Sequence, residues 1–371
     1  MRQIKIAFIV ESLASGGAEK VCVTLSNYFV SHKIDVTIYI KNNSNKSIYE
    51  LDERIVVKEV CYPRAKRRKW KVVGSGWLYM RSLTIMLKEY NPDILISFGT
   101  MLNLLIIPIS KWIKKPVIVA EHSNHIYNNT IYKKLLFLLR RYLYRFADVL
   151  TVLTQFDYEY YRKFLKNVIV IHNPILLEEN KYNIERRNIV LAVGTYDSYY
   201  IKGFDRLIQL FPFKEGGNWT LAIAGKGDKN VLEPFINKRG NSSDVKLLGE
   251  VKDMKNLYKS VSIFALSSRL EGLPMALLEA MSYGCACISF NCISGPAEII
   301  DHGINGYLVE NGDIKGFKSR LIELMGNQKL RTKFGEAAME KSKNFSIEKI
   351  GKNWIQIIEQ VLKKRGKAYL K

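Results

Sequence analysis

The sequence predicts an α/β protein built from two doubly wound, Rossmann-like halves. Three observations lead to this fold class: two series in which apolar segments alternate with amphipathic ones, a polar stretch between the series, and a helix start suited to an anion in the second series. Alternating strands and helices are typical of a parallel sheet with helices on both faces. A length of 371 residues also favours two domains.

The first series begins with an apolar run near the N-terminus and ends at Ile171. Within it, the uncharged segment Ile94–Ser110 is shorter than the about 20 apolar residues of a membrane span, and it contains Gly99, Asn103 and Pro108. We therefore expect a buried strand and a buried helix there. The expected strands are Ile4–Val10, Asp35–Ile40, Ile94–Ser97, Val117–Ala120, Val149–Leu153 and Val168–Ile171, and the expected helices are Glu19–His32, Trp77–Glu89, Leu102–Ile113 and 132–146.

The second series follows the charged stretch Glu178–Arg187, which is the natural linker. We expect one domain over residues 1–177 and a second over 178–351, with a final helix of about 352–371 packing back onto the first. Apolar residues on one face of Ser346–Lys363 support that helix. The expected strands are Ile189–Val193, Trp219–Ala224, Val245–Leu248, Ile263–Leu266 and Ala286–Phe290, and the expected helices are Phe204–Phe211, Lys229–Arg239, Met254–Lys259 and Glu271–Met281.

The segment Ser268–Met281 carries the strongest chemical signal. Glu271 and Glu279 bracket seven residues, the first before a helix start and the second inside the helix. Gly272 allows an unusual backbone angle or close approach by a ligand, and Pro274 suits the first helical position. A helix N-terminus offers backbone N–H groups to an anion. The arrangement suits a ligand with a central phosphate and hydroxyls at both ends, such as a nucleotide-sugar.

This Glu-x7-Glu pattern resembles the donor-site signature of the retaining glycosyltransferases of family 4. Four further segments match that family in the same order. They are Ser15-Gly16-Gly17-Ala18-Glu19, Glu121-His122-Ser123-Asn124, and the pair Gly295–Ile300 and Gly303–Val309. The resemblance runs from about residue 4 to the last helix, and it includes transferases of bacterial surface polysaccharides and lipid-linked oligosaccharides. It implies the GT-B fold, in which two Rossmann-like domains face each other across a cleft.

The resemblance also implies roles for individual residues. Glu271 and His122 would meet the donor sugar, Lys202 would neutralise the leaving diphosphate, and these three are the expected catalytic residues. The family's usual Arg after the strand glycine is absent, because the sequence reads Gly194-Thr195-Tyr196, and Lys226 is a candidate to compensate. The expected donor-binding residues are Glu279, Gly272, Leu273, Pro274, Met275, Gly16, Gly17, Thr195, Lys226 and Val251.

The excess of positive over negative charge is concentrated in the first half. Residues 1–172 hold 27 Lys/Arg against 13 Asp/Glu, a net charge of +14, whereas residues 173–371 hold 30 against 22, a net of +8. Basic amphipathic stretches are typical of membrane-surface binding, and nucleic acid is the competing interpretation. No nucleic-acid motif is present, so we predict an anionic membrane partner. The expected acceptor or membrane contacts are Arg64, Lys66, Arg67, Arg68, Lys69, Lys71, Arg140 and Arg141.

We therefore predict a cytoplasmic, membrane-peripheral glycosyltransferase on the inner face of a bacterial cell membrane. It would move a hexose or N-acetylhexosamine with retention from a nucleotide-sugar, most simply a UDP-sugar, to a lipid-linked or growing glycan acceptor. Five cysteines without a second pair or His cluster favour reduced thiols. No Asp-x-Asp motif is present, so we expect no metal and no cofactor. The alternatives are a catalytically weak lipid- or glycan-binding partner subunit and a sugar-nucleotide epimerase on the same fold.

Overall fold

The computed structural model describes residues 3–14, 16–41, 49–61, 71–126, 133–178, 185–212, 217–239 and 242–366, with side chains for all of these except 71–75, 133–134, 239 and 242. The chain divides into two compact units, Met1–Leu176 with Ile347–Lys371, and Leu177–Ser346. The expected boundary fell between residues 177 and 178. The segment that returns to the first unit begins at Ile347, where about 352 was expected.

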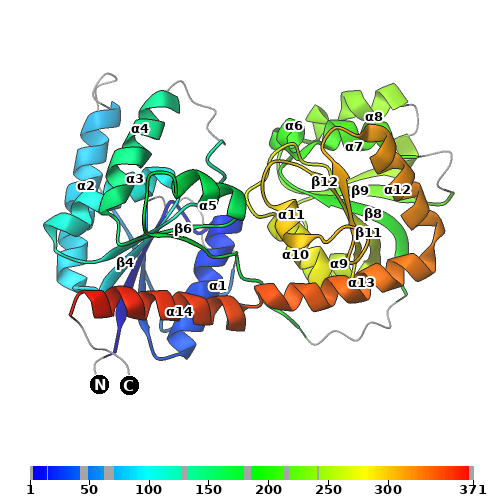
Figure 1. Ribbon diagram of the computed structural model, residues 1–371. Helices are drawn as coiled ribbons and strands as arrows, with labels where there is room; N and C mark the ends of the chain where they lie inside the picture. The colour runs from blue at the N-terminus through cyan, green and yellow to red at the C-terminus, as the bar shows by residue number, and fades with distance from the viewer. Residues whose placement is uncertain are drawn as a thin grey trace. The chain divides into compact units, whose positions relative to one another are not determined.

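The first unit is a parallel sheet with strand order β3-β2-β1-β4-β5-β6-β7. Alternate residues of its strands face opposite sides, so each strand contributes to two layers of core. Helices lie on both faces (Figure 1). The strands are β1 Lys5–Val10, β2 Asp35–Ile40, β3 Val56–Glu59, β4 Ile94–Phe98, β5 Val117–Ala120, β6 Val149–Val152 and β7 Val168–Val170, and the helices are α1 Gly17–Ser31, α2 Lys71–Tyr90, α3 Thr100–Trp112, α4 Lys133–Leu143, α5 Gln155–Tyr161 and α14 Ile347–Lys364.

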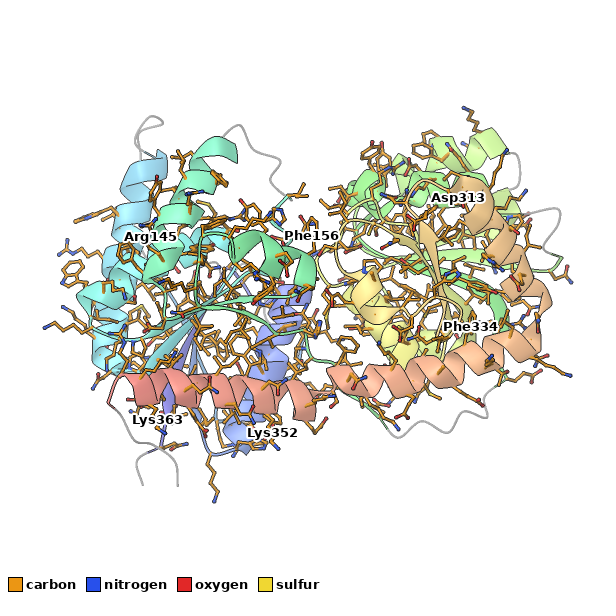
Figure 2. All side chains as sticks on the ribbon, in the orientation of Figure 1. Arg145, Phe156, Asp313, Phe334, Lys352 and Lys363 are labelled. Atoms are coloured by element: carbon orange, nitrogen blue, oxygen red, sulfur yellow. The ribbon has the colours of Figure 1, made fainter. Side chains whose placement is uncertain are left out.

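Helices α1 and α14 cover one face of this sheet. Phe8 of β1 stacks on Phe29 of α1, and Phe98 of β4 meets Trp354 of α14 edge-on. Gly351 lets α14 approach α1 closely, since a Cβ there would lie 2.4 Å from the Tyr28 ring. The buried residues of α14 face the sheet, whereas Lys352 and Lys363 project outward (Figure 2). The final helix thus completes the core of the first unit.

The second unit is a parallel sheet with strand order β10-β9-β8-β11-β12-β13. One core, which includes Val190, Ile223 and Ile288 of the strands, lies beneath α7 and α12. The strands are β8 Arg187–Val193, β9 Thr220–Ala224, β10 Val245–Gly249, β11 Val261–Leu266, β12 Ala286–Asn291 and β13 Tyr307–Glu310, and the helices are α6 Tyr199–Lys202, α7 Phe204–Leu210, α8 Glu233–Arg239, α9 Met254–Ser260, α10 Met275–Ser282, α11 Pro296–Ile299, α12 Ile314–Gly326 and α13 Gln328–Ser342.

Most expected elements are present, and the differences have physical reasons. Strand β3 was missed because its residues are largely exposed and show no apolar alternation. The expected helix 229–239 is a short 3-10 turn followed by α8, with Pro234 in the first turn of α8. The apolar segment beginning at Ile94 is β4 followed by α3, as predicted. Over the described residues, every helix is too short or too polar to cross a bilayer.

Candidate functional site

Two of the expected catalytic residues meet in the second unit. Lys202 Nζ lies 2.8 Å from Glu271 Oε1, and Ser268 Oγ donates to the same carboxylate oxygen at 2.6 Å. The Glu271 side chain is only 9% exposed, whereas that of Lys202 is 29% exposed. Charge-assisted hydrogen bonds of this kind are short and fix orientation. The loop between β11 and α10 therefore holds Glu271 directly in front of the first turn of α10.

A glycine makes this pairing possible. Lys202 ends α6, and Gly203 follows with a left-handed backbone at φ 68° before α7 begins. A Cβ on Gly203 would lie 1.8 Å from the Ser267 carbonyl oxygen, so only glycine admits the loop so close. Ser267 Oγ also donates to the Lys202 carbonyl at 2.9 Å. The Lys-Gly pair in the sequence thus positions the ammonium group against the carboxylate loop.

Arg206 anchors the same loop from beneath, and sequence reasoning missed it. This arginine of α7 is buried, and its guanidinium donates to the carbonyls of Ser267 and Ser268, each at 2.5 Å. It also donates to Asn311 at 3.1 Å and stacks 4.0 Å from the Phe290 ring centroid. Burial, together with the nearby Arg269 charge, lowers its pKa to about 10. A charged residue on the otherwise apolar face of α7 was the available signal.

Glu279 is also held in place. Tyr258 of α9 donates its hydroxyl to Glu279 Oε2 at 3.0 Å. Burial, and then the Glu279 charge, raise the Tyr258 pKa well above its usual value, so the phenol stays a donor at neutral pH. Because α10 is helical from Met275, Glu279 stands one turn further in than the first helical residue. The two glutamates of the sequence signature therefore occupy the loop before α10 and its second turn.

The backbone of the signature loop differs from expectation in two details. Pro274 is the N-cap of α10, not its first helical residue. Gly272 is not among the described glycines with a left-handed backbone, so of its two expected roles only close approach by a ligand stays a prediction. A close approach of backbone to backbone occurs at Gly295, where φ is 96° and a Cβ would lie 2.1 Å from the Gly272 carbonyl oxygen. Leu273 is buried and Met275 is half-buried beside this contact.

Tyr196 is buried beside the position, directly after the strand glycine Gly194, at which the family usually has an arginine. It follows Thr195 at the end of β8, is fully buried, donates to the Ile223 carbonyl at 2.9 Å and accepts from the Gly249 N–H at 2.8 Å. Its own N–H donates to the Lys226 carbonyl at 2.8 Å. The tyrosine thereby ties the ends of β8, β9 and β10 together. Lys226 is exposed above this contact, and Val251 is half-buried.

In the first unit, His122 stands just beyond the carboxyl end of β5. Both ring nitrogens are buried and have no hydrogen-bond partner among the described residues. The ring packs edge-on against Phe98, with centroids 4.5 Å apart. Burial lowers the His122 pKa to about 4. The imidazole is therefore neutral at pH 7.

We expect His122 to make stability depend on pH. Its folded pKa of about 4 lies below the ordinary histidine value of 6.5, so the unfolded chain binds the proton more tightly and folding weakens as pH falls from 6.5 to 4. A shift of this size corresponds to about 3 kcal/mol in total. Urea denaturation of the parent and His122→Asn at pH 7 and pH 5 measures it. The parent should lose more stability than the variant, and equal losses would contradict the assignment.

Beside His122 lies a buried ionic cluster that corrects one prediction. Arg140 of α4 lies 3.6 Å from Glu121 and donates to Thr100 Oγ1 at 2.5 Å. Tyr144 and Thr100 also donate to the Glu121 carboxylate. Arg140 and Glu121 are each 2% exposed. The prediction that Arg140 contacts a membrane surface is therefore wrong, because its guanidinium neutralises an internal carboxylate.

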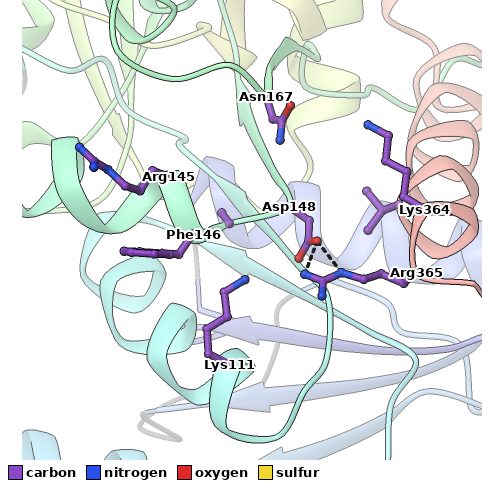
Figure 3. Close-up of a pocket in the computed structure, with 9 residues that line it drawn as sticks. Lys111, Arg145, Phe146, Asp148, Asn167, Lys364 and Arg365 are labelled. Atoms are coloured by element: carbon purple, nitrogen blue, oxygen red, sulfur yellow. Dashed lines mark hydrogen bonds and ion pairs between the residues drawn. The ribbon is translucent and has the colours of Figure 1, made fainter.

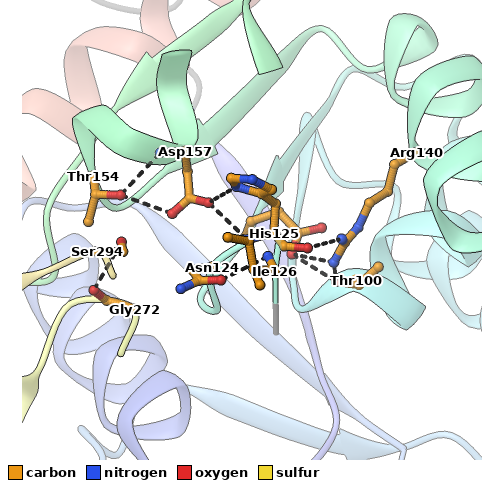
Figure 4. Close-up of polar contacts among 10 residues, drawn as sticks. Thr100, Asn124, His125, Ile126, Arg140, Thr154, Asp157, Gly272 and Ser294 are labelled. Atoms are coloured by element: carbon orange, nitrogen blue, oxygen red, sulfur yellow. Dashed lines mark hydrogen bonds and ion pairs between the residues drawn. The ribbon is translucent and has the colours of Figure 1, made fainter. Parts of the chain in front are cut away.

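A histidine–aspartate pair fixes the rest of this loop. His125 Nδ1 lies 2.8 Å from Asp157 Oδ1, which also accepts the His125 backbone N–H at 2.9 Å. Thr154 caps α5 and binds the other carboxylate oxygen at 2.9 Å (Figure 4). The His125 ring stacks on Tyr160 with centroids 3.8 Å apart. These contacts hold the loop that carries His122 against α5.

The remaining expected residues are placed as follows. Gly16 precedes α1 with an extended backbone, and Gly17 is the first residue of that helix. Arg141 is exposed, with its guanidinium 5.7 Å from the Phe164 ring centroid. Lys71 begins α2, and its side chain is not described. The basic residues Arg64, Lys66, Arg67, Arg68 and Lys69 lie outside the described residues. No group of three or more His, Cys, Asp or Glu within the described ranges could hold a metal ion.

The chain is similar to known proteins in sequence and in fold. The sequence model for glycosyl transferases group 1 matches residues 176–341, and that for glycosyltransferase family 4 matches residues 15–179. The GalNAc-alpha-(1->4)-GalNAc-alpha-(1->3)-diNAcBac-PP-undecaprenol alpha-1,4-N-acetyl-D-galactosaminyltransferase of Campylobacter jejuni is 30% identical, over 96% of this chain and 99% of that one. The amylovoran biosynthesis glycosyltransferase AmsD of Erwinia amylovora is also 30% identical, over 95% and 99%.

A solved structure extends the likeness to the fold. A point mutant of S. aureus TarM, in complex with fondaparinux, alpha-GlcNAc-glycerol and UDP, superimposes with a TM-score of 0.79 at 15% identity, over 96% of this chain and 100% of that one. At this identity the likeness concerns the fold alone, and it confirms the predicted GT-B class of two Rossmann-like domains. With relatives matched along nearly their whole length, and with both glutamates of the signature ordered around α10, the chain belongs to glycosyltransferase family 4 and is a glycosyltransferase.

Proposed function

We propose that this protein transfers a hexose or N-acetylhexosamine from a UDP-sugar, with retention of configuration, to a lipid-linked or growing glycan in bacterial polysaccharide biosynthesis. The observation that carries the proposal is the contact between Lys202 and Glu271 in front of α10. The Campylobacter relative is named for a polyprenol-linked glycan, and TarM was solved with UDP. Neither the partner-subunit alternative nor the epimerase alternative is favoured by these relatives.

In this proposal the donor diphosphate lies at the start of α10. The N-terminus of that helix presents backbone N–H groups and the positive end of its dipole. Lys202 adds a full positive charge beside it, so the two can neutralise the charge that develops on the leaving diphosphate. The same reasoning makes a metal unnecessary for that task. Glu279, oriented by Tyr258, would accept hydrogen bonds from the ribose hydroxyls.

Glu271 would bind the hydroxyls of the donor sugar. Its carboxylate already accepts from Ser268 and pairs with Lys202, and the loop beneath it is tied to Arg206. A carboxylate held in one orientation is preorganised to accept hydrogen bonds from the sugar hydroxyls before the substrate binds. The acceptor oxygen would bond to the anomeric carbon as the bond to the diphosphate breaks. The acceptor proton would pass to the departing phosphate oxygen, so the reaction needs no protein base.

The proposal also places the protein peripherally on the inner face of the cell membrane. The support is the excess of basic residues in the first 172 residues, where Lys and Arg outnumber Asp and Glu by 14. Polybasic segments are attracted to anionic lipid by about 1 kcal/mol per residue near the surface. A lipid-linked acceptor resides in the same surface, so membrane attachment would bring enzyme and acceptor together.

A panel of nucleotide-sugars tests the proposal. We expect UDP and one UDP-sugar to raise the melting temperature, since a ligand that binds only the folded state stabilises it. Transfer of that sugar to a polyprenol-linked glycan should then be detectable by mass spectrometry, and NMR of the product should show the donor's anomeric configuration. Stabilisation by other nucleotides alone would overturn the choice of UDP. Inversion in the product would overturn the proposed mechanism.

Replacing Lys202 separates phosphate binding from nucleoside binding. We expect Lys202→Ala to weaken UDP binding by about 10- to 100-fold, because a hydrogen bond to a charged group contributes roughly 1.5–3 kcal/mol. Uridine binding should change little. Calorimetry with UDP and with uridine measures both affinities. Lys226→Ala tests whether Lys226 supplies a second positive charge to the diphosphate. Lys246→Ala, which removes an exposed lysine from β10, is the control. Equal losses for UDP and uridine would show that Lys202 does not contact phosphate.

A further inference from the structure

A basic pocket lies at the edge of the first unit's sheet opposite to His122. It has a volume of about 260 Å³, and β5 and β6 begin beside it. The carboxyl ends of the same strands carry the loop with His122, so the two places are separated by the length of the strands. The pocket is lined by Lys111, Arg145, Phe146, Ala147, Asp148, Asn167, Val361, Lys364 and Arg365.

The charge of this pocket is strongly positive. Four cationic side chains line it against one carboxylate. That carboxylate, Asp148, is already satisfied, because Oδ1 accepts from Arg365 at 2.7 Å and Oδ2 accepts the Val117 N–H at 2.9 Å. In Figure 3, Lys111 and Asn167 point toward the Asp148–Arg365 pair from opposite sides. Among the described residues, Lys111 and Lys364 have no ion-pair partner, so the pocket presents uncompensated donors to a small anion.

An apolar stripe on the same unit leads to this pocket. Leu135, Leu138 and Tyr142 of α4 are followed by Phe146 in the adjoining 3-10 turn, at spacings of three and four residues that place them on one helical face. Each is between 46% and 53% exposed. Phe146 both ends the stripe and lines the pocket. Exposed apolar residues that adjoin cations are typical of a surface that lies on a membrane.

We propose that the pocket binds the phosphate group of an anionic phospholipid headgroup, while the stripe Leu135, Leu138, Tyr142 and Phe146 lies in the same membrane surface. The pocket supplies the charge that a phosphate diester needs, and the stripe supplies the apolar contact that a soluble phosphate would not use. Trp112, which follows Lys111 at the end of α3 and is 69% exposed, adds an aromatic side chain of the kind that favours the interface. This inference extends the membrane-peripheral part of the proposed function and identifies its residues.

Vesicle partitioning of the full chain tests the site. The charge variant is Lys111→Gln with Lys364→Gln, both exposed residues whose replacement should not disturb folding. With vesicles of phosphatidylglycerol in phosphatidylcholine, we expect its partition coefficient to fall about 25-fold, about fivefold per lysine. The matched control, Lys329→Gln with Lys333→Gln, removes the same charge from α13 of the second unit and should change partitioning by less than about threefold. Equal losses in the two variants would overturn the site.

Two further arms distinguish the source of the phosphate. Leu138→Ser with Tyr142→Ser should also lose vesicle binding, while inorganic phosphate still raises the melting temperature of that variant as much as the parent's. If inorganic phosphate stabilises the parent but vesicle partitioning is the same in parent and charge variant, the pocket serves a soluble phosphate and the lipid proposal fails. Transfer to a short soluble acceptor should be unchanged in every variant. If the parent protein itself transfers no sugar to that acceptor, this result would count against the proposed function and not against the lipid site.

Discussion

Glu271→Ala is expected to lower kcat by about 100- to 1,000-fold, the usual effect of removing one preorganised electrostatic group. The physical reason is the position of the carboxylate. It stands in front of α10, it is only 9% exposed, and Ser268 and Lys202 hold it in one orientation. Removing it would leave the donor hydroxyls without their acceptor and the Lys202 ammonium without its partner. Steady-state kinetics with an active donor measure the effect.

Controls separate this effect from damage to the fold. Glu271→Gln keeps an oxygen that can accept a hydrogen bond from Ser268 but lacks the negative charge. Its kcat should therefore lie between those of Glu271→Ala and the parent. Glu310→Ala removes an exposed carboxylate from β13 of the same unit and should leave kcat unchanged. The melting temperature should change little, because Glu271 lies in a loop and supports no core. A Glu271→Ala enzyme with kcat within about threefold of the parent would remove this residue from the mechanism.

Arg140→Met is expected to destabilise the first unit by about 3–5 kcal/mol. Breaking a buried ion pair leaves an uncompensated charge, which costs much more than the pair itself contributes. Here the charge left behind is Glu121, which is 2% exposed and would keep the hydroxyls of Thr100 and Tyr144 as its donors among the residues that the structure describes. Urea denaturation measures the loss, both as the change in the midpoint concentration and as the change in the free energy of unfolding extrapolated to water.

The neighbouring arginine provides the matched control. Arg141→Met removes the same charge from an exposed position on the same helix, and such surface changes usually stay within about 0.5 kcal/mol. The double variant Glu121→Gln with Arg140→Met should recover most of the loss, because it buries no unpaired charge. Similar small losses for Arg140→Met and Arg141→Met would mean that the buried pair does not stabilise the unit.

The second unit lacks the family's usual arginine after the strand glycine, since the sequence there reads Gly194-Thr195-Tyr196. Tyr196 fills the interior beside that turn and joins three strand ends by hydrogen bonds. Arg206 instead sits beneath the loop and binds two of its carbonyls. In the proposed function, the charge for the diphosphate then comes from Lys202 and α10. The Lys202 experiment is therefore also the test of whether one cation suffices.

The sequence by itself determined the fold class, most elements and the order of the motifs. Alternation of apolar segments with amphipathic ones predicted two parallel sheets, because strands and helices differ in the spacing of their apolar residues along the sequence. The signature from Ser268 to Met281 correctly placed Glu279 within a helix, although α10 begins at Met275 and not at Glu271, where the expected helix range began. These features are local. Each depends on residues within one or two turns of each other, so no knowledge of distant contacts was needed.

Only the tertiary structure decided which charged residues are buried and which groups meet. Arg140 and Arg141 are neighbours in sequence, yet one pairs with Glu121 inside the unit and the other is exposed, because a helix turns about 100° per residue. In the sequence, Arg206 is 61 and 62 residues from Ser267 and Ser268, whose carbonyls it binds. Asp148 and Arg365 are 217 residues apart. Such contacts exist only once the sheet brings strand ends together, and for that reason the sequence pattern could not reveal them.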